Sequence, residues 1–189
     1  MREWRTDADV LAASRCEPQV FIVIFDRHFA AISRYLGRRL RWPVAEELAA
    51  EVFATAFAAR ARYDVSRPDA LPWLYGIAAN AVRTHARREE RELELVARAG
   101  ADPAVTRIDS TDGVASGLES TLAKGLLRLS VDEREVLLLF AWADLGYEQI
   151  AEALGIPVGT VKSRLNRARA GVRAALAELE GTYEEVANG

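Results

Sequence analysis

The chain has 189 residues, half of them hydrophobic and 28% charged, with a formal net charge of −3 at pH 7. This length suits one or two small domains, and no apolar run approaches the roughly 20 residues of a membrane span. A single cysteine excludes an internal disulfide and favours a reducing cytoplasm, and the two histidines do not complete a cluster at metal-ligand spacing. With no phosphate-binding glycine loop either, we expect neither a metal, nor a cofactor, nor an enzyme.

Helix-forming residues dominate the first half of the chain, and apolar residues recur every three or four positions. The pattern predicts a short helix over residues 7–15, capped by Asp7 or Asp9. Pro, Asp and Ser cluster at residues 63–72, which predicts a loop there. Three longer helices are predicted over residues 19–41, 44–62 and 73–95.

Residues 97–121 have a different composition, rich in Gly, Ala, Ser, Thr and Asp, with four acids to one arginine between 99 and 120. Such a segment is typical of a flexible acidic linker. The fold class predicted is therefore all-α, with two small helical domains joined by this linker. The predicted parts are a first domain over 1–96, the linker over 97–121, a second domain over 122–181 and a polar tail over 182–189.

The second domain contains "GYEQIAEALGIPVGTVKSRLNRARAGV", which has the layout of a helix-turn-helix. Gly155 permits the tight turn, and Pro157 suits the start of the second helix. At about 100° per residue, one side of that helix is apolar and the opposite side is polar. The apolar side carries Val161, Leu165, Ala168 and Val172, and the polar side carries Gly159, Ser163, Asn166, Arg167 and Ala170, with Lys162 at its edge.

Five cations and no acid lie between residues 157 and 173. No acid lies four positions away to relieve their repulsion along the helix. A solvated surface helix is the alternative, but small and amide side chains mixed with cations suit the DNA major groove, where Arg contacts guanine and Asn contacts adenine. We therefore predict DNA contact by this helix, and we expect the acidic remainder of the chain to limit indiscriminate binding to phosphate.

Two stretches of the first domain carry further patterns. The segment "PVAEELAAEVFATAF" at residues 43–57 contains three glutamates and no cation. In "PWLYGIAANAVRTHARREER" at residues 72–91, an expected core side lies beside a stripe that changes from aromatic to polar to basic. The core side carries Leu74, Ala78, Ala81 and His85, and the stripe carries Trp73, Ile77, Asn80, Thr84, Arg87 and Arg91. We expect His28 to be half-buried or partner-facing, and Cys16 to be a small buried hydrophobe.

These stretches, in this order and across a linker of this length, resemble the extracytoplasmic-function (ECF) group of bacterial RNA polymerase sigma factors. The resemblance rests on "AEELAAEVF" and "WLYGIAANAVRTHARR", and on "LLRLSVDEREVLLLFAWADLGYEQIAEALGIPVGTVKSRLNRAR". It implies binding to the RNA polymerase core, through its beta and beta-prime subunits, and promoter-directed initiation of transcription. The first domain would recognise the minus-ten element of promoter DNA and the second the minus-35 element. An anti-sigma factor is a further candidate partner, and we expect no membrane insertion.

The same correspondence implies three groups of site residues. Polymerase docking would fall on Glu46, Glu47, Leu48, Glu51 and Val52. Minus-ten contacts would fall on the loop at 64–70, with Ser66 and Arg67, and on Trp73, Asn80, Arg83, Thr84 and Arg87. Minus-35 contacts would fall on Tyr147, Thr160, Lys162, Ser163, Arg164, Asn166 and Arg167. Ala50, Ala79 and Thr84 depart from residues common in the family, and the last two bear on the minus-ten base preference.

Two other functional classes match parts of the pattern. A stand-alone DNA-binding regulator would need only a second domain of this kind, and the first domain argues against it. A polymerase-binding protein whose DNA contact is incidental would not need a basic recognition helix.

Overall fold

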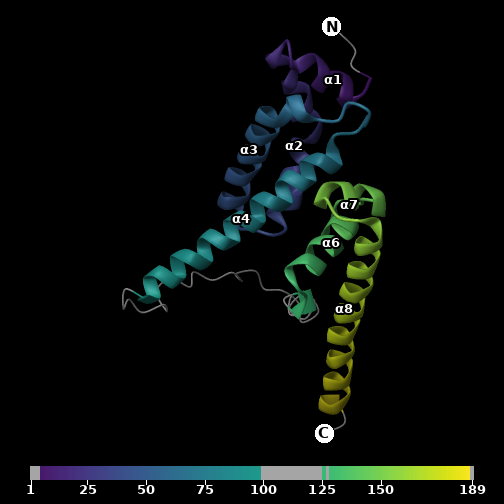
Figure 1. Ribbon diagram of the computed structural model, residues 1–189. Helices are drawn as coiled ribbons and strands as arrows, with labels where there is room; N and C mark the ends of the chain where they lie inside the picture. Colours follow the sequence, from purple (N-terminus) through teal and green to yellow (C-terminus); the bar gives the residue numbers. More distant parts are fainter. Residues whose placement is uncertain (1–4, 99–124, 127, 188–189) are drawn as a thin grey trace. The chain divides into compact units, whose positions relative to one another are not determined.

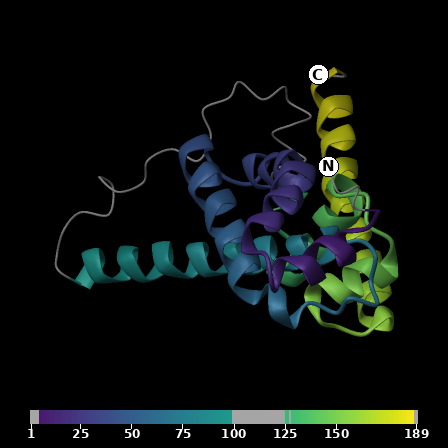
Figure 2. The ribbon, with the colours of Figure 1, turned by 90° about the horizontal axis from the view of Figure 1, so that it is seen from above.

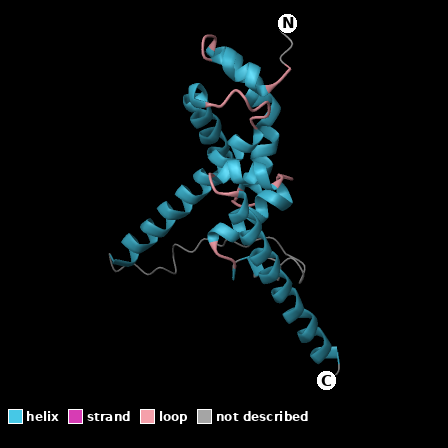
Figure 3. Ribbon diagram, turned by 45° about the vertical axis from the view of Figure 1, so that its right-hand side comes forward, coloured by secondary structure: helices cyan, strands magenta, loops and turns pink. Residues whose placement is uncertain are grey.

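The computed structural model describes residues 5–98, 125–126 and 128–187, and the regular structure among these residues is helical, without strands (Figures 1 and 3). The expected all-α class is confirmed. None of the helices in the described part of the chain combines the length and apolar character that a bilayer crossing requires. In chain order the elements are α1 (Asp7–Ser14), η1 (Pro18–Phe21), α2 (Ile22–Gly37), α3 (Trp42–Ala59), η2 (Arg60–Arg62), α4 (Leu71–Arg98), α6 (Val131–Trp142), α7 (Tyr147–Leu154) and α8 (Val158–Ala187).

Helices α1 to α4 belong to one compact unit, and α6, α8 and the first part of α7 belong to another. Most of the predicted linker lies in residues 99–124, outside the described residues. Helix α4 continues to Arg98 and projects beyond α2 and α3 (Figure 2), and α8 continues to Ala187, so both helices extend past the limits expected at 96 and 181. Neither extension contains a proline, and the single Gly181 costs only about 1 kcal/mol in a helix.

The N-cap of α1 is Thr6, and not Asp7 or Asp9 as the sequence predicts. The Thr6 hydroxyl accepts a hydrogen bond from the Asp9 amide at 3.1 Å. The Asp9 carboxylate accepts the Thr6 amide in return, also at 3.1 Å, which completes a capping box. Asp7 is therefore the first helical residue, and its side chain is available for contacts outside α1.

The core of the first unit lies where α2 and α4 pack on α3. Phe25 and Phe29 stack on each other at 4.6 Å between ring centroids, and Phe53 of α3 meets the ring of Phe25 at 5.0 Å. The helix predicted over 19–41 consists of the 3-10 turn η1, which begins at Pro18, and of α2, which ends at Gly37. It therefore ends four residues earlier than expected. Pro43 then lies in the first turn of α3, where its missing amide costs no hydrogen bond.

Three predicted burial states in the first unit can be compared with the structure. Cys16 is exposed, because it lies in the turn that follows α1, so its expected burial is wrong. His85 is half-buried rather than packed in the core, and its Nε2 lies 3.4 Å from a carboxylate oxygen of Glu89, one turn along α4. His28 is half-buried, which confirms one of the two alternatives expected for it.

The second unit is built on the packing of α6 against α8. Val136 and Leu139 of α6, and Leu165 and Ala168 of α8, are almost completely buried. Gly171 of α8 lies close to Leu129, just before α6: a Cβ atom there would lie 2.7 Å from the end of the Leu129 side chain, which would have to shift.

Candidate nucleic-acid interface

A tight turn at Gly155 joins α7 to α8. Its φ of +63° lies in the left-handed region that glycine adopts readily. The Ile156 amide donates to the Ala151 carbonyl at 3.0 Å, and the Pro157 carbonyl accepts the Val161 amide at 3.2 Å. These bonds end one helix and begin the next, so the predicted helix-turn-helix is confirmed.

The N-terminal half of α8 has two distinct sides, as the sequence predicts. Val161, Leu165 and Ala168 are buried against the unit. Thr160 and Arg164 are half-buried at the boundary, and the Ser163 hydroxyl donates to the Thr160 carbonyl at 3.0 Å. The exposed side carries Gly159, Lys162, Ser163, Asn166, Arg167 and Ala170. This side combines hydrogen-bonding groups, positive charge and small residues that permit close approach.

Acids from the first turn of α6 pair with two arginines of α8. Arg164 Nη2 lies 2.5 Å from Asp132 Oδ2, and Arg167 Nε lies 2.7 Å from Glu133 Oε1. No acid of the same helix offsets the repulsion among these cations, as the sequence predicts, but two acids of α6 do so. The packing of α6 on α8 supplies acids more than 30 residues away in the sequence.

Tyr147 and Lys162, both predicted to contact DNA, lie beside each other. Lys162 Nζ lies 5.9 Å from the centroid of the half-buried Tyr147 ring, which stacks on Phe140. Arg169 lies over the other aromatic ring, with its guanidinium 4.8 Å from the Phe140 centroid. The start of α7, at Tyr147, therefore lies directly beside the exposed side of α8, at Lys162.

In the first unit, the loop at 64–70 is fixed by hydrogen bonds at both ends. Buried Tyr63 lies at its start, and its hydroxyl is within 2.8 Å of the Arg67 carbonyl and 3.0 Å of the Asp69 carbonyl. Burial and the negative charge of Asp7 raise the pKa of Tyr63 to about 12, so the hydroxyl keeps its proton as donor. Ser66 is exposed, and its amide and hydroxyl both donate to the Asp64 carboxylate, which closes a local turn.

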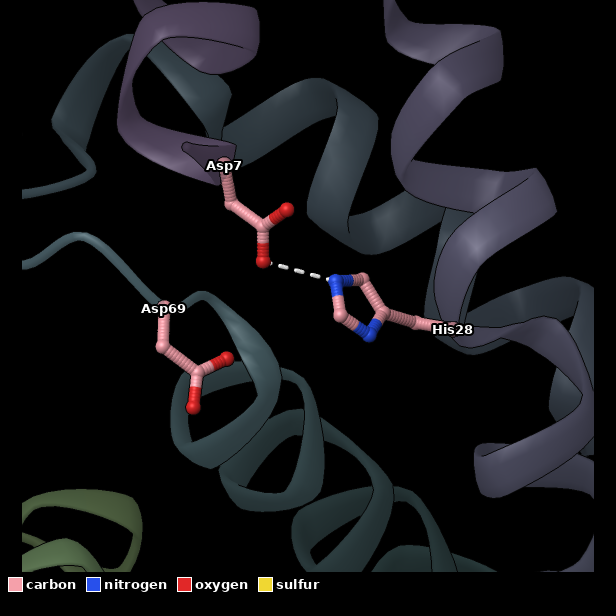
Figure 4. Close-up of side chains that lie close together, drawn as sticks. All are labelled: Asp7, His28 and Asp69. Atoms are coloured by element: carbon pink, nitrogen blue, oxygen red, sulfur yellow. Dashed lines mark hydrogen bonds and ion pairs between the residues drawn. The ribbon is translucent and has the colours of Figure 1, made fainter. Parts of the chain in front are cut away.

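Asp7 links this loop to α1 and α2, a contact that the local sequence pattern does not predict. Figure 4 shows its interaction with His28. Its Oδ2 accepts the Ala70 amide at 3.0 Å and lies 2.7 Å from His28 Nε2, while Oδ1 lies 2.8 Å from Arg27 Nη1. The Asp7 amide donates to the Pro68 carbonyl at 3.0 Å. Burial raises the pKa of Asp7, but the hydrogen bonds from His28, Ala70 and Arg27 outweigh it and lower the pKa to about 2.

Asp7, His28 and Asp69 offer ligand atoms within 4.8 Å of one another, a spacing that a cation could use. The Asp7 carboxylate already accepts three hydrogen bonds, one of them from a guanidinium. A second positive charge there would be repelled by Arg27. The cluster therefore fits a hydrogen-bonded tie better than a metal site.

The predicted stripe of α4 begins beside the loop. Trp73 is half-buried, and its ring centroid lies 5.0 Å from that of Tyr63. Arg83 is half-buried, and Asn80, Thr84 and Arg87 are exposed farther along the helix. Because a helix rises about 1.5 Å per residue, Trp73 and Arg87 lie roughly 20 Å apart. The structure thus brings Trp73 to the loop and spreads the other candidates along one helix.

The candidates of α3 fall into two groups. Glu46, Glu47 and Glu51 are exposed, and Glu47 and Glu51, together with Leu48, line a small pocket of about 100 Å³. Leu48 and Val52 are only 6% and 0% exposed, so they pack into the core. Their burial shows that they hold α3 in place, and their expected contact with polymerase stays a prediction, as does that of the exposed glutamates.

Comparison with known proteins identifies the family. The model of Sigma-70 region 2 matches residues 24–92, and the model of Sigma-70, region 4 matches residues 121–170. RNA polymerase sigma factor CarQ of Myxococcus xanthus is 32% identical over 160 residues, which cover 83% of this chain and 89% of that protein. ECF RNA polymerase sigma factor SigL of Mycobacterium tuberculosis is 33% identical over 177 residues, which cover 91% and 97%.

Solved structures support the same fold. CnrH, in complex with the cytosolic domain of CnrY, has a TM-score of 0.65 and 22% identity, over 91% of this chain and 97% of that chain. RpoE of Bartonella quintana, in complex with the anti-sigma factor NepR, has a TM-score of 0.58 and 24% identity, over 87% and 98%.

The chain belongs to the ECF group of RNA polymerase sigma factors. It therefore acts with RNA polymerase in promoter recognition and in the initiation of transcription, and its partners are the polymerase core and promoter DNA.

Proposed function

We propose that α8 contacts the minus-35 element through its exposed side, formed by Lys162, Ser163, Asn166 and Arg167, with Tyr147, Thr160 and Arg164 at its edges. The observation that carries this proposal is the division of α8 into a buried apolar side and an exposed side of cations, an amide and small residues. A helix of this kind fits the major groove, where arginine and asparagine distinguish bases by paired hydrogen bonds.

We propose further that the first unit contacts the minus-ten element through the 64–70 loop and the stripe of α4. The loop is exposed at Ser66 and Arg67 and is fixed at both ends. Trp73 offers a half-buried ring beside it, and Asn80, Thr84 and Arg87 offer exposed polar groups, with Arg83 half-buried between them. Aromatic rings and polar side chains of this kind suit unpaired bases, whose faces and edges are both accessible.

The glutamates of α3 are proposed to contact the polymerase core. Carboxylates would be repelled by DNA phosphates, so an exposed acidic surface on a promoter-binding protein suits a protein partner instead. In this account the chain is a non-catalytic initiation factor that acts in the cytoplasm, where it would meet the polymerase core.

Selection from a promoter library tests these assignments. The purified chain and core polymerase would transcribe templates in which either the upstream or the minus-ten element is randomised, and the transcribed templates would be sequenced. The α8 variants Arg167→Ala and Asn166→Ala should change the selected upstream bases only, and α4 variant Asn80→Ala the minus-ten bases only. If an α8 variant changed the minus-ten bases instead, the assignment of the two units would be wrong.

We also propose that an anti-sigma factor binds this chain. Support comes from fold similarity to RpoE of Bartonella quintana, which was solved with the anti-sigma factor NepR. A protein that co-purifies with the chain in its native cells should reduce run-off transcription by the reconstituted holoenzyme. If every co-purifying protein left transcription unchanged, this part of the proposal would fail.

A further inference from the structure

Glu133 joins the cap of α6 to the recognition helix through two different carboxylate oxygens. Its Oε2 accepts hydrogen bonds from the Ser130 amide at 3.2 Å and from the Ser130 hydroxyl at 2.8 Å. Its Oε1 accepts Arg167 Nε at 2.7 Å. Hydrogen bonds from Ser130, with a further one from Arg167, lower the pKa of the Glu133 carboxyl. One side chain therefore caps α6 and holds an arginine of α8 (both helices are shown in Figure 1).

The geometry of Arg167 leaves part of its guanidinium available. Only Nε is hydrogen-bonded within the part of the chain that the structure describes, so Nη1 and Nη2 have no partner there. The Arg167 side chain is 61% exposed, whereas that of Glu133 is only 19% exposed. An arginine can donate two parallel hydrogen bonds to guanine O6 and N7. Holding Nε leaves the terminal pair of nitrogens free for such a contact.

Capping alone does not require the charge of Glu133. A glutamine can serve at the same position of a capping box, because one side-chain oxygen accepts the N-cap amide. A surface ion pair also contributes little to stability. The charge of the Glu133 carboxylate beside Arg167 therefore has a role separate from folding. It holds the guanidinium in one orientation, and it opposes the attraction of the guanidinium for phosphate.

We propose that Glu133 is a positioning residue that sets the base selectivity of Arg167. It orients the guanidinium toward a base edge and lowers its affinity for DNA backbone of any sequence. The proposal rests on the proposed role of α8 at the minus-35 element. Asp132, which pairs with the half-buried Arg164, is the neighbouring acid in the same turn of α6.

The test compares holoenzymes that contain the wild-type chain, Glu133→Gln, Arg167→Ala or both changes. Binding to a promoter with its selected upstream element is measured against a promoter with that element scrambled, over a range of salt concentrations. Glu133→Gln should reduce this selectivity about three- to tenfold, short of the full loss of a base-contacting arginine. It should also steepen the salt dependence of binding to the scrambled promoter by roughly one ionic contact.

The double variant separates positioning from a general structural effect. If Glu133 acts through Arg167, Glu133→Gln should change nothing further in the Arg167→Ala background. Asp144→Asn is the matched control, because it removes an exposed carboxylate of the same unit at a turn position that asparagine tolerates. Helical circular dichroism and thermal melting would establish that each variant is folded.

Three results would overturn the proposal. An equal loss of selectivity from Glu133→Gln with and without Arg167 would mean that Glu133 acts by another route. Unchanged selectivity in Glu133→Gln, with a clear loss in Arg167→Ala, would remove the positioning role and leave the proposed function intact. Unchanged selectivity in Arg167→Ala would contradict the proposed minus-35 contact itself, and the role of Glu133 with it.

Discussion

The carboxylate of Asp7 accepts hydrogen bonds from Arg27 and His28, which are neighbours on α2, and from the Ala70 amide at the end of the 64–70 loop. Burial alone would favour the protonated acid, but these donors favour the charged form and hold the pKa at about 2. The Asp7 amide also donates to the Pro68 carbonyl, so both the backbone and the side chain of Asp7 join α1 to the loop. A residue outside the predicted site thus determines the conformation of a loop within it.

The hydrogen bonds of the Asp7 carboxylate predict that the stability of the first unit depends on pH. The folded pKa of Asp7 lies below the ordinary value of 3.8, so its contribution is present above about pH 4 and is lost as the pH falls toward 2. The shift corresponds to about 2 kcal/mol of unfolding free energy. Asp7→Asn should lower the stability of the first unit by about this amount at pH 7, with a smaller difference at pH 3, as measured by urea unfolding.

Asp26→Asn is the control for this prediction, because Asp26 is an exposed carboxylate of α2 in the same unit. It should leave the pH dependence of unfolding unchanged. Equal acid sensitivity of the wild type and Asp7→Asn would show that the tie does not stabilise the charged carboxylate.

Individual helices were predictable from periodicity, but contacts between helices were not. The spacing of Val161, Leu165 and Ala168 sufficed to separate the two sides of α8, because both sides belong to one regular helix. The pairing of Arg167 with Glu133 depends on how α6 packs against α8, and nothing in the local pattern of either segment specifies it. The same holds for Asp7, which lies more than 60 residues from Ala70 in the sequence.

At α3, the periodicity and the family correspondence lead to different expectations for the same two residues. Leu48 and Val52 lie one turn apart in the apolar stripe of their helix, and both are buried. Burial therefore agrees with the periodicity. The docking role that the family correspondence implies for them stays a prediction.

The exposed side of α8 predicts that two substitutions have different effects on DNA binding: one on base preference and one on overall affinity. Arg167→Ala should cost about 1–3 kcal/mol on the preferred upstream element and relax the preference at one base position. Lys162→Ala should weaken binding more evenly across sequences if its ammonium meets phosphate, with a smaller salt slope. Holoenzyme binding to upstream-element variants, measured by fluorescence anisotropy, checks both.

Arg173→Ala is a matched control, because Arg173 is an exposed cation farther along α8. It should leave the base preference intact, and all three variants should bind core polymerase like the wild type. An unchanged upstream preference in both Lys162→Ala and Arg167→Ala would contradict the assignment of the exposed side.

The acidic side of α3 predicts an effect on assembly rather than on DNA. Glu47 and Glu51 lie four residues apart and are both exposed, so reversing them to lysine changes one face of the helix. The double variant should form holoenzyme more slowly, chiefly through a lower association rate constant. Surface plasmon resonance with immobilised core polymerase measures this rate constant directly.

The control for this prediction reverses Glu17 and Asp26, two exposed acids elsewhere in the first unit, with the same change in net charge. A similar loss of association in this control would indicate a general charge effect. Normal association of the Glu47 and Glu51 variant, with its helical content unchanged, would mean that these glutamates form only a solvated surface.

In the whole chain, the composition of the predicted linker, residues 97–121, predicts a role for its acidic charge in initiation. This segment contains Asp102, Asp109, Asp112 and Glu119, whose carboxylates DNA would repel but a basic protein channel would accept. Replacement by a Gly/Ser segment of equal length should retain core binding and reduce run-off transcription. A scrambled segment that keeps the four acids is the control, and it should transcribe better than the neutral one. Equal transcription by both would mean that the segment serves only as a connection.

We propose that this chain gives core polymerase its promoter specificity through both units together. Run-off transcription with purified core polymerase tests it most directly, on a promoter with both selected elements and on versions with either element scrambled. We predict no specific transcript without the chain, a strong transcript with it, and a large loss when either element is scrambled. A chain that failed to direct core polymerase to this promoter, yet bound the upstream element tightly on its own at physiological salt, would contradict the account and would identify a stand-alone regulator.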